Sequence, residues 1–368
     1  MKYYSLAKIN KLNCKYNLIF GLRSNGKTYS ILEYCLDRFV KYGEQCAIVR
    51  RYAEDFKGKR GRTYFDNLMC NGNNKNMVRI MTNGQYDRII YYSGCWYLGY
   101  WDEELQKNIQ QEKPFAYAFG VNQMEHDKST SYPLVTTIFM DEFITRTHYI
   151  NDEFLLFMNV VSTIVRNRSN VKIYMAANTV SSGRYNPYFK EMGLNHVSKM
   201  QPGDIDVYTY GDSKLRVAVE YCDAPSKGKP SDVYFAFDNP KLKMITGGEW
   251  ELDIYPHLTE KYNKKDIIFS YFILFDEYVL QADIIITDRL KFTYIHLKTS
   301  DIKRPDEDII YSLTPVERHN CYTSLVNPCN DITKKIAMFF KANKVFYQSN
   351  DIGEIVNQYL LQCNKRYT

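Results

Sequence analysis

A glycine-rich segment near the N-terminus has the residues and the spacing of a phosphate-binding loop. Residues 21–28, Gly-Leu-Arg-Ser-Asn-Gly-Lys-Thr, fit the pattern GxxxxGK[ST] in full. In such a loop backbone N–H groups surround phosphates, the lysine reaches the β- and γ-phosphates, and the hydroxyl of the last residue binds Mg²⁺. The expected nucleotide-binding residues are Gly21, Arg23, Ser24, Asn25, Gly26, Lys27 and Thr28.

The elements around this loop have the order that a phosphate-binding loop requires. An apolar run over residues 16–20 predicts a buried strand, and apolar residues at helical spacing over 28–40 predict a helix. Gly43 suits the C-terminal end of that helix, and residues 46–49 predict a second buried strand. Strand, helix and strand at this spacing predict a parallel βαβ unit, and hence an α/β fold.

Two adjacent carboxylates follow another predicted strand. Residues 138–142, Ile-Phe-Met-Asp-Glu, have the Walker B form, in which Asp141 holds Mg²⁺. Glu142 can then polarise an attacking water as a general base, which a hydrolase needs and a small-molecule kinase does not. The pair therefore favours ATP hydrolysis with Mg²⁺ as the cofactor.

Further polar residues follow the neighbouring elements. Asn178 comes directly after a predicted strand, where it could contact the γ-phosphate or the attacking water, or be an ordinary turn residue. Arg166 and Arg168 lie near the end of a predicted helix. Either could be an arginine finger offered to the ATP of a neighbouring subunit, or a cation favoured by the helix dipole. Arg50 and Arg51 follow the second strand and are expected near the phosphates.

Composition excludes several classes of protein. The 368 residues are 45% hydrophobic and 24% charged, as in globular proteins, and the formal charge of +6 permits a polyanionic partner without identifying one. Nine cysteines form no CxxC pair, which favours reduced thiols over a zinc clamp. We expect no secretory signal and no membrane-spanning segment.

Pattern changes along the chain predict more than one domain. Alternating residues over 77–100 favour a β-meander inserted into the α/β frame, and residues 224–230 are polar and suit a connector. Beyond them the pattern predicts three strands, over 267–275, 278–286 and 291–297, followed by two helices, over 332–344 and 353–363. The expected divisions are an ATPase domain over 1–203, a linker region over 204–257 and an α+β domain over 258–368.

Together these motifs resemble the genome-packaging ATPases of phi29-type tailed phages. The resemblance covers nearly the whole N-terminal domain and rests chiefly on stretches outside the Walker motifs. The resembling stretches are the phosphate-binding loop and residues 38–45, 49–52, 131–133, 140–144, 166–168, 177–181 and 186–189, and those outside the Walker motifs are the specific ones.

This resemblance implies an ASCE-type motor that forms a ring of five subunits on the portal of a prohead and drives double-stranded DNA inward. The motor would work in the cytoplasm of the infected host cell, transiently on the prohead. It further implies that Arg166 is a trans-acting finger. A lysine that the family carries shortly after Arg-Arg-Tyr is absent, because Ala53 and Glu54 follow Tyr52.

The resemblance also implies an RNase H-like C-terminal domain, while its residues indicate a degenerate nuclease. Asp276, Glu277, Asp283 and Asp288 are the carboxylates of the strand-rich part, and their spacing does not favour the convergence that two-metal cleavage needs. Docking on a structural packaging RNA stays open. So does another ASCE motor, such as a helicase or a conjugation-type DNA pump, and a scaffold with a decayed ATP site is disfavoured by the intact Walker residues.

Overall fold

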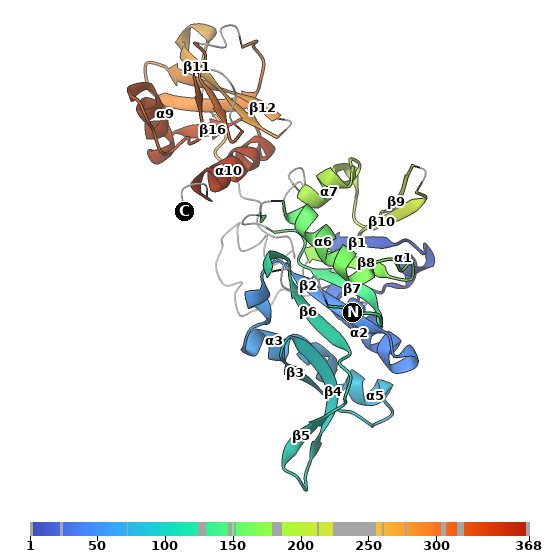
Figure 1. Ribbon diagram of the computed structural model, residues 1–368. Coiled ribbons are helices and arrows are strands. Elements are labelled where there is room, and N and C mark those ends of the chain that lie inside the picture. The colour runs from blue at the N-terminus through green and yellow to red at the C-terminus, as the bar shows by residue number, and fades with distance from the viewer. Residues whose placement is uncertain are drawn as a thin grey trace. The chain divides into compact units, whose positions relative to one another are not determined.

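The computed structural model divides the chain into two compact units, residues 1–251 and 252–368 (Figure 1). It describes residues 3–22, 25–71, 73–123, 130–145, 149–150, 152–178, 186–211, 213–223, 255–259, 261–276, 278–302, 307–314 and 320–365. None of the helices in these ranges combines the length and the apolar composition needed to cross a bilayer.

The described strands of the first unit form one ten-stranded sheet, in the order β3-β4-β6-β2-β7-β8-β1-β10-β9 with β5 beside β4. The six strands from β6 to β10 in this order run parallel to one another, and the adjoining strands on both sides, β4 and β9, are antiparallel to them. The strands are β1 Tyr16–Gly21, β2 Gln45–Arg50, β3 Arg88–Tyr92, β4 Cys95–Asp102, β5 Lys107–Gln110, β6 Ala116–Gly120, β7 Val135–Asp141, β8 Lys172–Asn178, β9 Ile205–Tyr210 and β10 Leu215–Tyr221.

Helices cover both faces of the parallel part of the sheet (Figure 1). Neighbouring residues of β1 divide between the two sides, because Leu18 belongs to the buried cluster that contains Val160 of α6, and Ile19 belongs to the cluster that contains Ile31 of α2. This explains why the parallel strands are apolar at successive positions rather than at alternate ones. The helices are α1 Ala7–Lys11, α2 Lys27–Tyr42, η1 Ala53–Phe56, α3 Lys59–Thr63, α4 Asp66–Met69, α5 Met77–Met81, α6 Glu153–Val165, α7 Pro187–Glu191 and η3 Val197–Lys199.

The structure corrects two of the predicted boundaries. The inserted β-meander begins only at Arg88, because residues 77–81 form the short helix α5. The sheet also continues past residue 203, since β10 pairs with β1 in parallel and β9 pairs with β10. The first part of the predicted linker therefore belongs to the large sheet, and residues 224–254 lie outside the described ranges.

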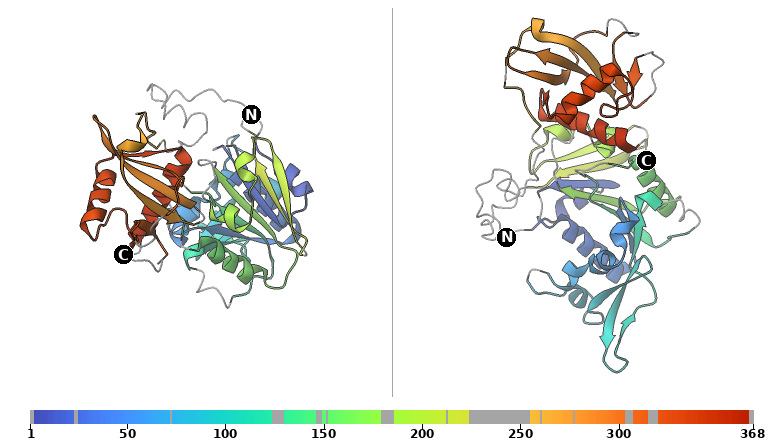
Figure 2. Two further views of the ribbon diagram at one scale, coloured as in Figure 1. Left: turned by 90° about the horizontal axis from the view of Figure 1, so that it is seen from above. Right: turned by 90° about the vertical axis from the view of Figure 1, so that its left-hand side faces the viewer.

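The described strands of the second unit form a six-stranded sheet in the order β15-β14-β11-β12-β13-β16. Helices α9 and α10, coloured red, lie against its orange strands (Figure 2), and Tyr359 of α10 meets Phe275 of β11 edge to face. The elements are η4 Lys264–Asp266, β11 Ile267–Phe275, β12 Tyr278–Ile286, β13 Lys291–Leu297, β14 Ile310–Ser312, β15 Cys321–Tyr322, α9 Asp331–Lys341, β16 Val345–Tyr347 and α10 Asn350–Lys365.

A buried ion pair lies between the central strands of the second unit. His296 Nε2 lies 3.1 Å from Asp283 Oδ2, and His296 Nδ1 lies 2.7 Å from the Leu297 carbonyl oxygen. Because both ring nitrogens face oxygen acceptors, the charged imidazolium is favoured. Burial alone would lower the pKa of His296, but these two partners raise it. Hydrogen bonds from His296, Ser270 and Gln281 outweigh burial and lower the pKa of Asp283.

We therefore predict that the second unit loses stability as the pH rises through the raised pKa of His296. A histidine with a raised folded pKa contributes all of its stabilisation below the unfolded value of about 6.5. That stabilisation disappears as the pH rises through the folded value. Calorimetry of the full chain from pH 6 to 9 should show one transition moving to lower temperature. His296→Gln should abolish that shift, and His196→Gln, in the first unit, should leave it intact. A shift that persists in His296→Gln would refute the assignment.

Candidate active site

The carboxyl ends of four parallel strands bring the predicted site residues together. Gly21 at the end of β1 is the register partner of Asn178 at the end of β8. Asp141 at the end of β7 pairs with Ala176 in the same strand β8. Strand β8 thus lies between the strand of the phosphate-binding loop and the strand of the paired carboxylates. This edge of a parallel sheet is where ligands bind in open α/β folds.

The phosphate-binding loop presents a buried lysine. Gly26 caps helix α2 in a left-handed conformation, with φ of 91°, which favours glycine. Lys27 is 5% exposed, and its Nζ donates to the carbonyl oxygens of Leu22 at 2.7 Å and Gly21 at 3.1 Å. Nζ also lies 3.4 Å from Asn178 Oδ1, so the amide predicted to contact a γ-phosphate is already beside the lysine. Burial lowers the pKa of Lys27 to about 8.

Asn25 brings a poorly satisfied donor to this loop. Its side chain is 5% exposed, and its Nδ2 has no oxygen or nitrogen partner within the described part of the chain. The Cys222 thiol beside this amide is a weak acceptor, so an anion held by this loop would give the donor a stronger partner. Arg23 and Ser24, two further predicted members of the loop, lie outside the described residues.

A hydroxyl and a carboxylate meet where Mg²⁺ is expected. Thr28 Oγ1 lies 3.3 Å from Asp141 Oδ1. These are oxygen donors of the kind that Mg²⁺ prefers, and such sites complete their coordination with water and substrate phosphates. The described residues contain no group of three or more His, Cys, Asp or Glu side chains able to hold a metal alone. The donor set fits a metal that binds together with a nucleotide.

Arg50 at the end of β2 and Tyr64 directly after α3 hold the Asp141 carboxylate. Arg50 donates from Nη2 to Oδ2 at 2.6 Å, and the Tyr64 hydroxyl donates to the same oxygen at 2.9 Å. Burial opposes the charge of Arg50, but Asp141 and Tyr64 outweigh it and raise the pKa of Arg50. Arg50 is therefore near the expected metal position, and Tyr64 is a site residue that the sequence did not reveal.

Glu142 is the accessible carboxylate of the pair. Its side chain is 61% exposed, whereas that of Asp141 is 4% exposed. Glu142 adopts a left-handed backbone, with φ of 63°, and its N–H donates to the Ala176 carbonyl oxygen at 2.8 Å. Non-glycine residues seldom adopt this conformation, and they do so mainly where the surroundings fix them. The strand end thus turns sharply at Glu142, and the two carboxylates differ in exposure although Arg50 approaches both.

A buried ion pair fixes the chain directly after Glu142. Arg51 forms a bidentate pair with Glu153 at the start of α6, with N–O distances of 2.7 and 2.8 Å. The Tyr188 hydroxyl donates to the same carboxylate at 2.8 Å. Arg51 also donates to the carbonyl oxygens of Phe143 at 3.2 Å and Glu142 at 3.4 Å. Arg51 was expected near the phosphates, but the structure directs it to this ion pair.

The two arginines after α6 lie at the other edge of the sheet. Arg168 donates to the carbonyl oxygens of Pro133 and Val135, at the amino end of β7. Arg166 is exposed and donates to the Thr130 carbonyl oxygen at 2.9 Å. The strand from Val135 to Asp141 spans roughly 20 Å at ~3.3 Å per residue. Neither arginine can therefore reach the phosphate-binding loop of its own chain.

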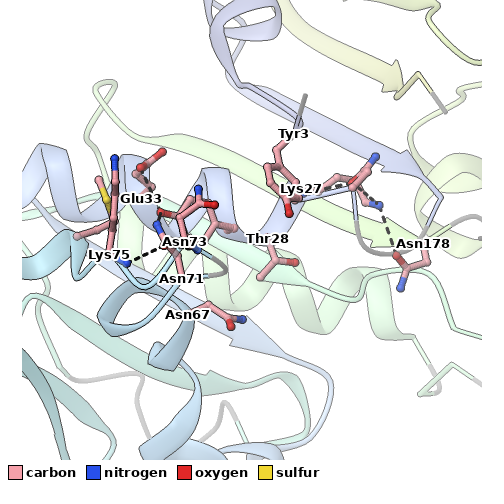
Figure 3. A pocket seen from close by; sticks show the side chains of 13 residues that line it. Tyr3, Lys27, Thr28, Glu33, Asn67, Asn71, Asn73, Lys75 and Asn178 are labelled. Atoms are coloured by element: carbon pink, nitrogen blue, oxygen red, sulfur yellow. Dashed lines mark hydrogen bonds between the residues drawn. The ribbon is translucent and has the colours of Figure 1, made fainter. Parts of the chain in front are cut away.

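A groove of about 550 Å³ runs from Asn178 past the phosphate-binding loop (Figure 3). This volume lies in the range of small-molecule sites. Four separate segments build it: the N-terminal segment, the phosphate-binding loop with the first two turns of α2, the stretch around α4 and α5, and the end of β8. Its lining residues are Tyr3, Asn25, Gly26, Lys27, Thr28, Tyr29, Glu33, Asn67, Asn71, Asn73, Lys75, Met77 and Asn178.

Comparisons with known proteins agree with this geometry. A sequence model of the podovirus DNA encapsidation protein (Gp16) family matches residues 1–87 and 106–209. DNA packaging proteins of Bacillus phages phi29 and PZA are each 30% identical over 190 residues, 51% of this chain and 49% of theirs. The chain thus spans about half the length of the curated relatives it matches.

Solved structures show the same fold along nearly the whole chain. A chain of the bacteriophage phi29 genome packaging motor assembly is similar with a TM-score of 0.57 at 20% identity. The similarity covers 99% of this chain and 100% of that one. The phi28 gp11 DNA packaging motor gives a TM-score of 0.53 at 16% identity, over 98% of both chains.

We predict that breaking the Arg51–Glu153 pair destabilises the first unit strongly. Glu153→Ala leaves a buried guanidinium without its counter-ion, which costs about 3–5 kcal/mol. The urea midpoint of the full chain, followed by circular dichroism, should fall accordingly. Glu54→Ala removes an exposed partner of Lys57 and should leave the midpoint unchanged. Equal midpoints for the two variants would show that the pair does not anchor the strand end.

Proposed function

The chain belongs to the podovirus DNA encapsidation protein (Gp16) family, and on that premise we propose that it is an ATP-hydrolysing motor that packages double-stranded DNA. One observation carries the proposal. Lys27, Thr28, Asp141, Glu142 and Asn178 meet at the carboxyl edge of one parallel sheet, although they are spread over 152 positions of sequence. The order of β1, β8 and β7 supports the ASCE class within the α/β fold.

Binding of MgATP follows from the contacts of the loop. Lys27 would exchange the carbonyl oxygens of Gly21 and Leu22 for β- and γ-phosphate oxygens. The negative phosphates would raise the pKa of Lys27, which burial lowers, and so favour the charged ammonium group. Thr28 and Asp141 would hold Mg²⁺, which neutralises charge on the phosphates. Arg50 competes for Asp141, so the arginine has to give up Oδ2 when the carboxylate turns to the ion.

Hydrolysis requires a base that reaches the attacking water. Glu142 is exposed at the strand end, and its carboxylate can accept the water proton as the oxygen attacks the γ-phosphorus. Asn178 lies beside Lys27 and can orient the same water or the γ-phosphate. Arg50 Nη1 lies 3.7 Å from Glu142 Oε2, so the arginine that holds Asp141 also approaches the base.

A ring of subunits would complete each site. Arg166 is exposed at the opposite sheet edge and cannot serve its own nucleotide, which supports a role as a finger in a neighbouring subunit. Head-to-tail contacts of this kind close into rings. We propose a homo-oligomeric ring of five subunits, as the resemblance implies.

The partners of this motor follow from its relatives. A portal at the prohead vertex and double-stranded DNA are the proposed partners, in the cytoplasm of the infected host and transiently on the prohead. The phi29 and PZA relatives are DNA packaging proteins by name. The net charge of +6 is compatible with DNA as the cargo. Docking on a structural packaging RNA remains part of the proposal.

We also propose that the second unit is an RNase H-like domain without nuclease activity. Three antiparallel strands, β11, β12 and β13, carry two parallel strands, β14 and β15, beside the first. Neither β11 nor β14 contains a carboxylate. Asp276 follows the end of β11, whereas Asp308 precedes the start of the parallel strand β14, so the two lie at opposite edges.

We expect the full chain to leave duplex DNA uncut with Mg²⁺ or Mn²⁺. Two-metal cleavage needs several carboxylates converging on ions about 4 Å apart. Asp283, the buried candidate, is already engaged by Ser270, Gln281 and His296. Gel analysis of plasmid DNA tests this expectation. Metal-dependent cutting that Asp283→Ala abolishes would make the unit an active nuclease.

Mixing two inactive variants tests the motor and its finger together. Glu142→Gln should bind MgATP but not hydrolyse it, because the amide cannot accept the proton. Arg166→Ala should also lose ATPase activity, because it deprives the neighbouring site of a cation. In an equimolar mixture about a quarter of the interfaces join an intact Glu142 to an intact Arg166. The mixture should therefore recover ATPase activity that neither variant has alone.

Two controls make this outcome decisive. Co-assembly is verified with differently tagged subunits, and Lys27→Ala mixed with Glu142→Gln should recover nothing, because a subunit with Lys27→Ala cannot bind nucleotide productively. Normal ATP turnover by Glu142→Gln would remove the base from the mechanism. Absence of recovery in co-assembled Arg166→Ala rings would place that arginine in a structural role.

A further inference from the structure

The groove beside the phosphate-binding loop has a second end that the phosphate contacts do not use (Figure 3). We propose that this end binds the adenosine part of the nucleotide, with the Tyr3 ring against the base and Glu33 accepting a hydrogen bond from its exocyclic amine. This inference rests on the proposed ATPase function. It adds the residues that distinguish one nucleoside triphosphate from another.

The position of the phosphates fixes the direction of the ligand. Lys27 and Asn178 mark the γ-phosphate end, and Thr28 faces Asp141. Glu33 lies six residues beyond Lys27 on α2, which is about 9 Å along the helix axis at ~1.5 Å per residue. A nucleotide whose triphosphate lies on the loop must extend its sugar and base in one direction. The groove continues along α2, so the base would lie toward Glu33.

The N-terminal segment holds Tyr3 beside the loop. The Tyr4 N–H donates to the Asn25 carbonyl oxygen at 2.8 Å, and the Tyr4 hydroxyl donates to Glu220 of β10 at 2.6 Å. Tyr3 therefore packs directly over Gly26, where even a Cβ atom would come within 3.3 Å of it. Yet Tyr3 is 58% exposed. An aromatic ring fixed at the mouth of a groove offers a face on which a base can stack.

The far end of the groove is polar and held by its own hydrogen bonds. Asn71 Oδ1 accepts from the N–H groups of Asn73 and Lys75 at 3.0 Å each, and these contacts order the loop before α5. Asn71 Nδ2 lies 3.5 Å from the Tyr29 hydroxyl, which itself lies 3.5 Å from Glu33 Oε1. Asn71 thus acts through the loop and Tyr29, as a positioning residue.

Glu33 is the hydrogen-bond acceptor that can recognise the base. Its hydrogen bond with Tyr29 is long, so its oxygens keep capacity for a stronger donor. Burial raises the pKa of Glu33, and a donor from the ligand would favour the ionised carboxylate again. Adenine carries an amino donor at position 6, whereas guanine carries a carbonyl acceptor there. A carboxylate facing that position would favour ATP over GTP.

Competition binding with the full chain separates the base from the phosphates. We would measure dissociation constants for MgATP, MgGTP and magnesium tripolyphosphate, by displacement of a fluorescent ATP analogue. Wild type should bind ATP more tightly than GTP and tripolyphosphate. Tyr3→Ala and Glu33→Gln should each weaken ATP binding about 10-fold, the size of one lost stacking or hydrogen-bond contact. Both should bind tripolyphosphate as wild type does, and Glu33→Gln should also narrow the preference for ATP over GTP.

Matched control variants, and melting temperatures equal to that of wild type, distinguish a loss of ligand binding from a loss of folding. Tyr92→Ala removes an exposed tyrosine of β3, and Glu103→Gln changes an exposed acid of the β4–β5 turn. Neither should change any of the three constants. If Tyr3→Ala and Glu33→Gln weaken tripolyphosphate as much as ATP, or weaken neither, the nucleoside site is refuted.

The same measurement separates failure of this inference from failure of the ATPase proposal. If wild type binds ATP and tripolyphosphate equally, the nucleoside site is refuted while the phosphate site stands. If wild type binds neither ligand, the ATPase function fails and the nucleoside site with it.

Discussion

The ion pair between Arg51 and Glu153 is the constraint on which the active site depends. A guanidinium buried at the end of a central strand must be paired, because an uncompensated charge there costs more than most single contacts contribute. Arg51 meets this requirement with Glu153 and with the carbonyl oxygens of Phe143 and Glu142. One side chain thereby connects the end of β2, the turn after β7 and the start of α6.

The neighbouring arginine shows why that connection matters for chemistry. Arg50 ends β2 and engages Asp141, whereas Arg51 turns to Glu153. Successive residues of a strand face opposite sides, so one dipeptide serves both the expected metal carboxylate and the scaffold behind it. The left-handed backbone of Glu142 is then maintained by contacts on both sides, through Ala176 and through Arg51. The position of the proposed base is therefore set by contacts within the protein.

The local residue pattern was sufficient to predict the elements whose apolar residues recur at strand or helix spacing. The predicted strands over 267–275, 278–286 and 291–297 have the same bounds in the structure, and Gly43 ends α2 as expected. The linker was misplaced because the edge strand β9 alternates in burial, as a strand of an independent hairpin does. Its partner β10 pairs with β1, about two hundred positions earlier in the sequence. Nothing in the hairpin's own sequence specifies that distant partner.

The same limit explains which site residues the sequence revealed. Asp141, Glu142 and Lys27 sit in motifs whose spacing carries the chemistry. The partner of Arg51 is 102 positions away, and Tyr64 reaches Asp141 across 77 positions, so neither contact leaves a local signal. The helix-end pattern alone did not separate Arg166 from Arg168, and only the resemblance favoured Arg166. The structure distinguishes them, because Arg168 is engaged by four backbone carbonyl oxygens while Arg166 is exposed.

The family match covers the candidate site and leaves one segment of the first unit outside the matched ranges. Every residue of the candidate site lies within the matched ranges, whereas residues 88–105 do not match. That unmatched segment forms β3 and β4, beyond β6 in the sheet order and away from β1, β8 and β7. It exposes Tyr92, Tyr100, Trp101 and Leu105. Substitutions in this segment can alter the surface of the protein without moving the strand ends beside Lys27 and Asp141. The parallel strands that separate the segment from the site are buried on both faces.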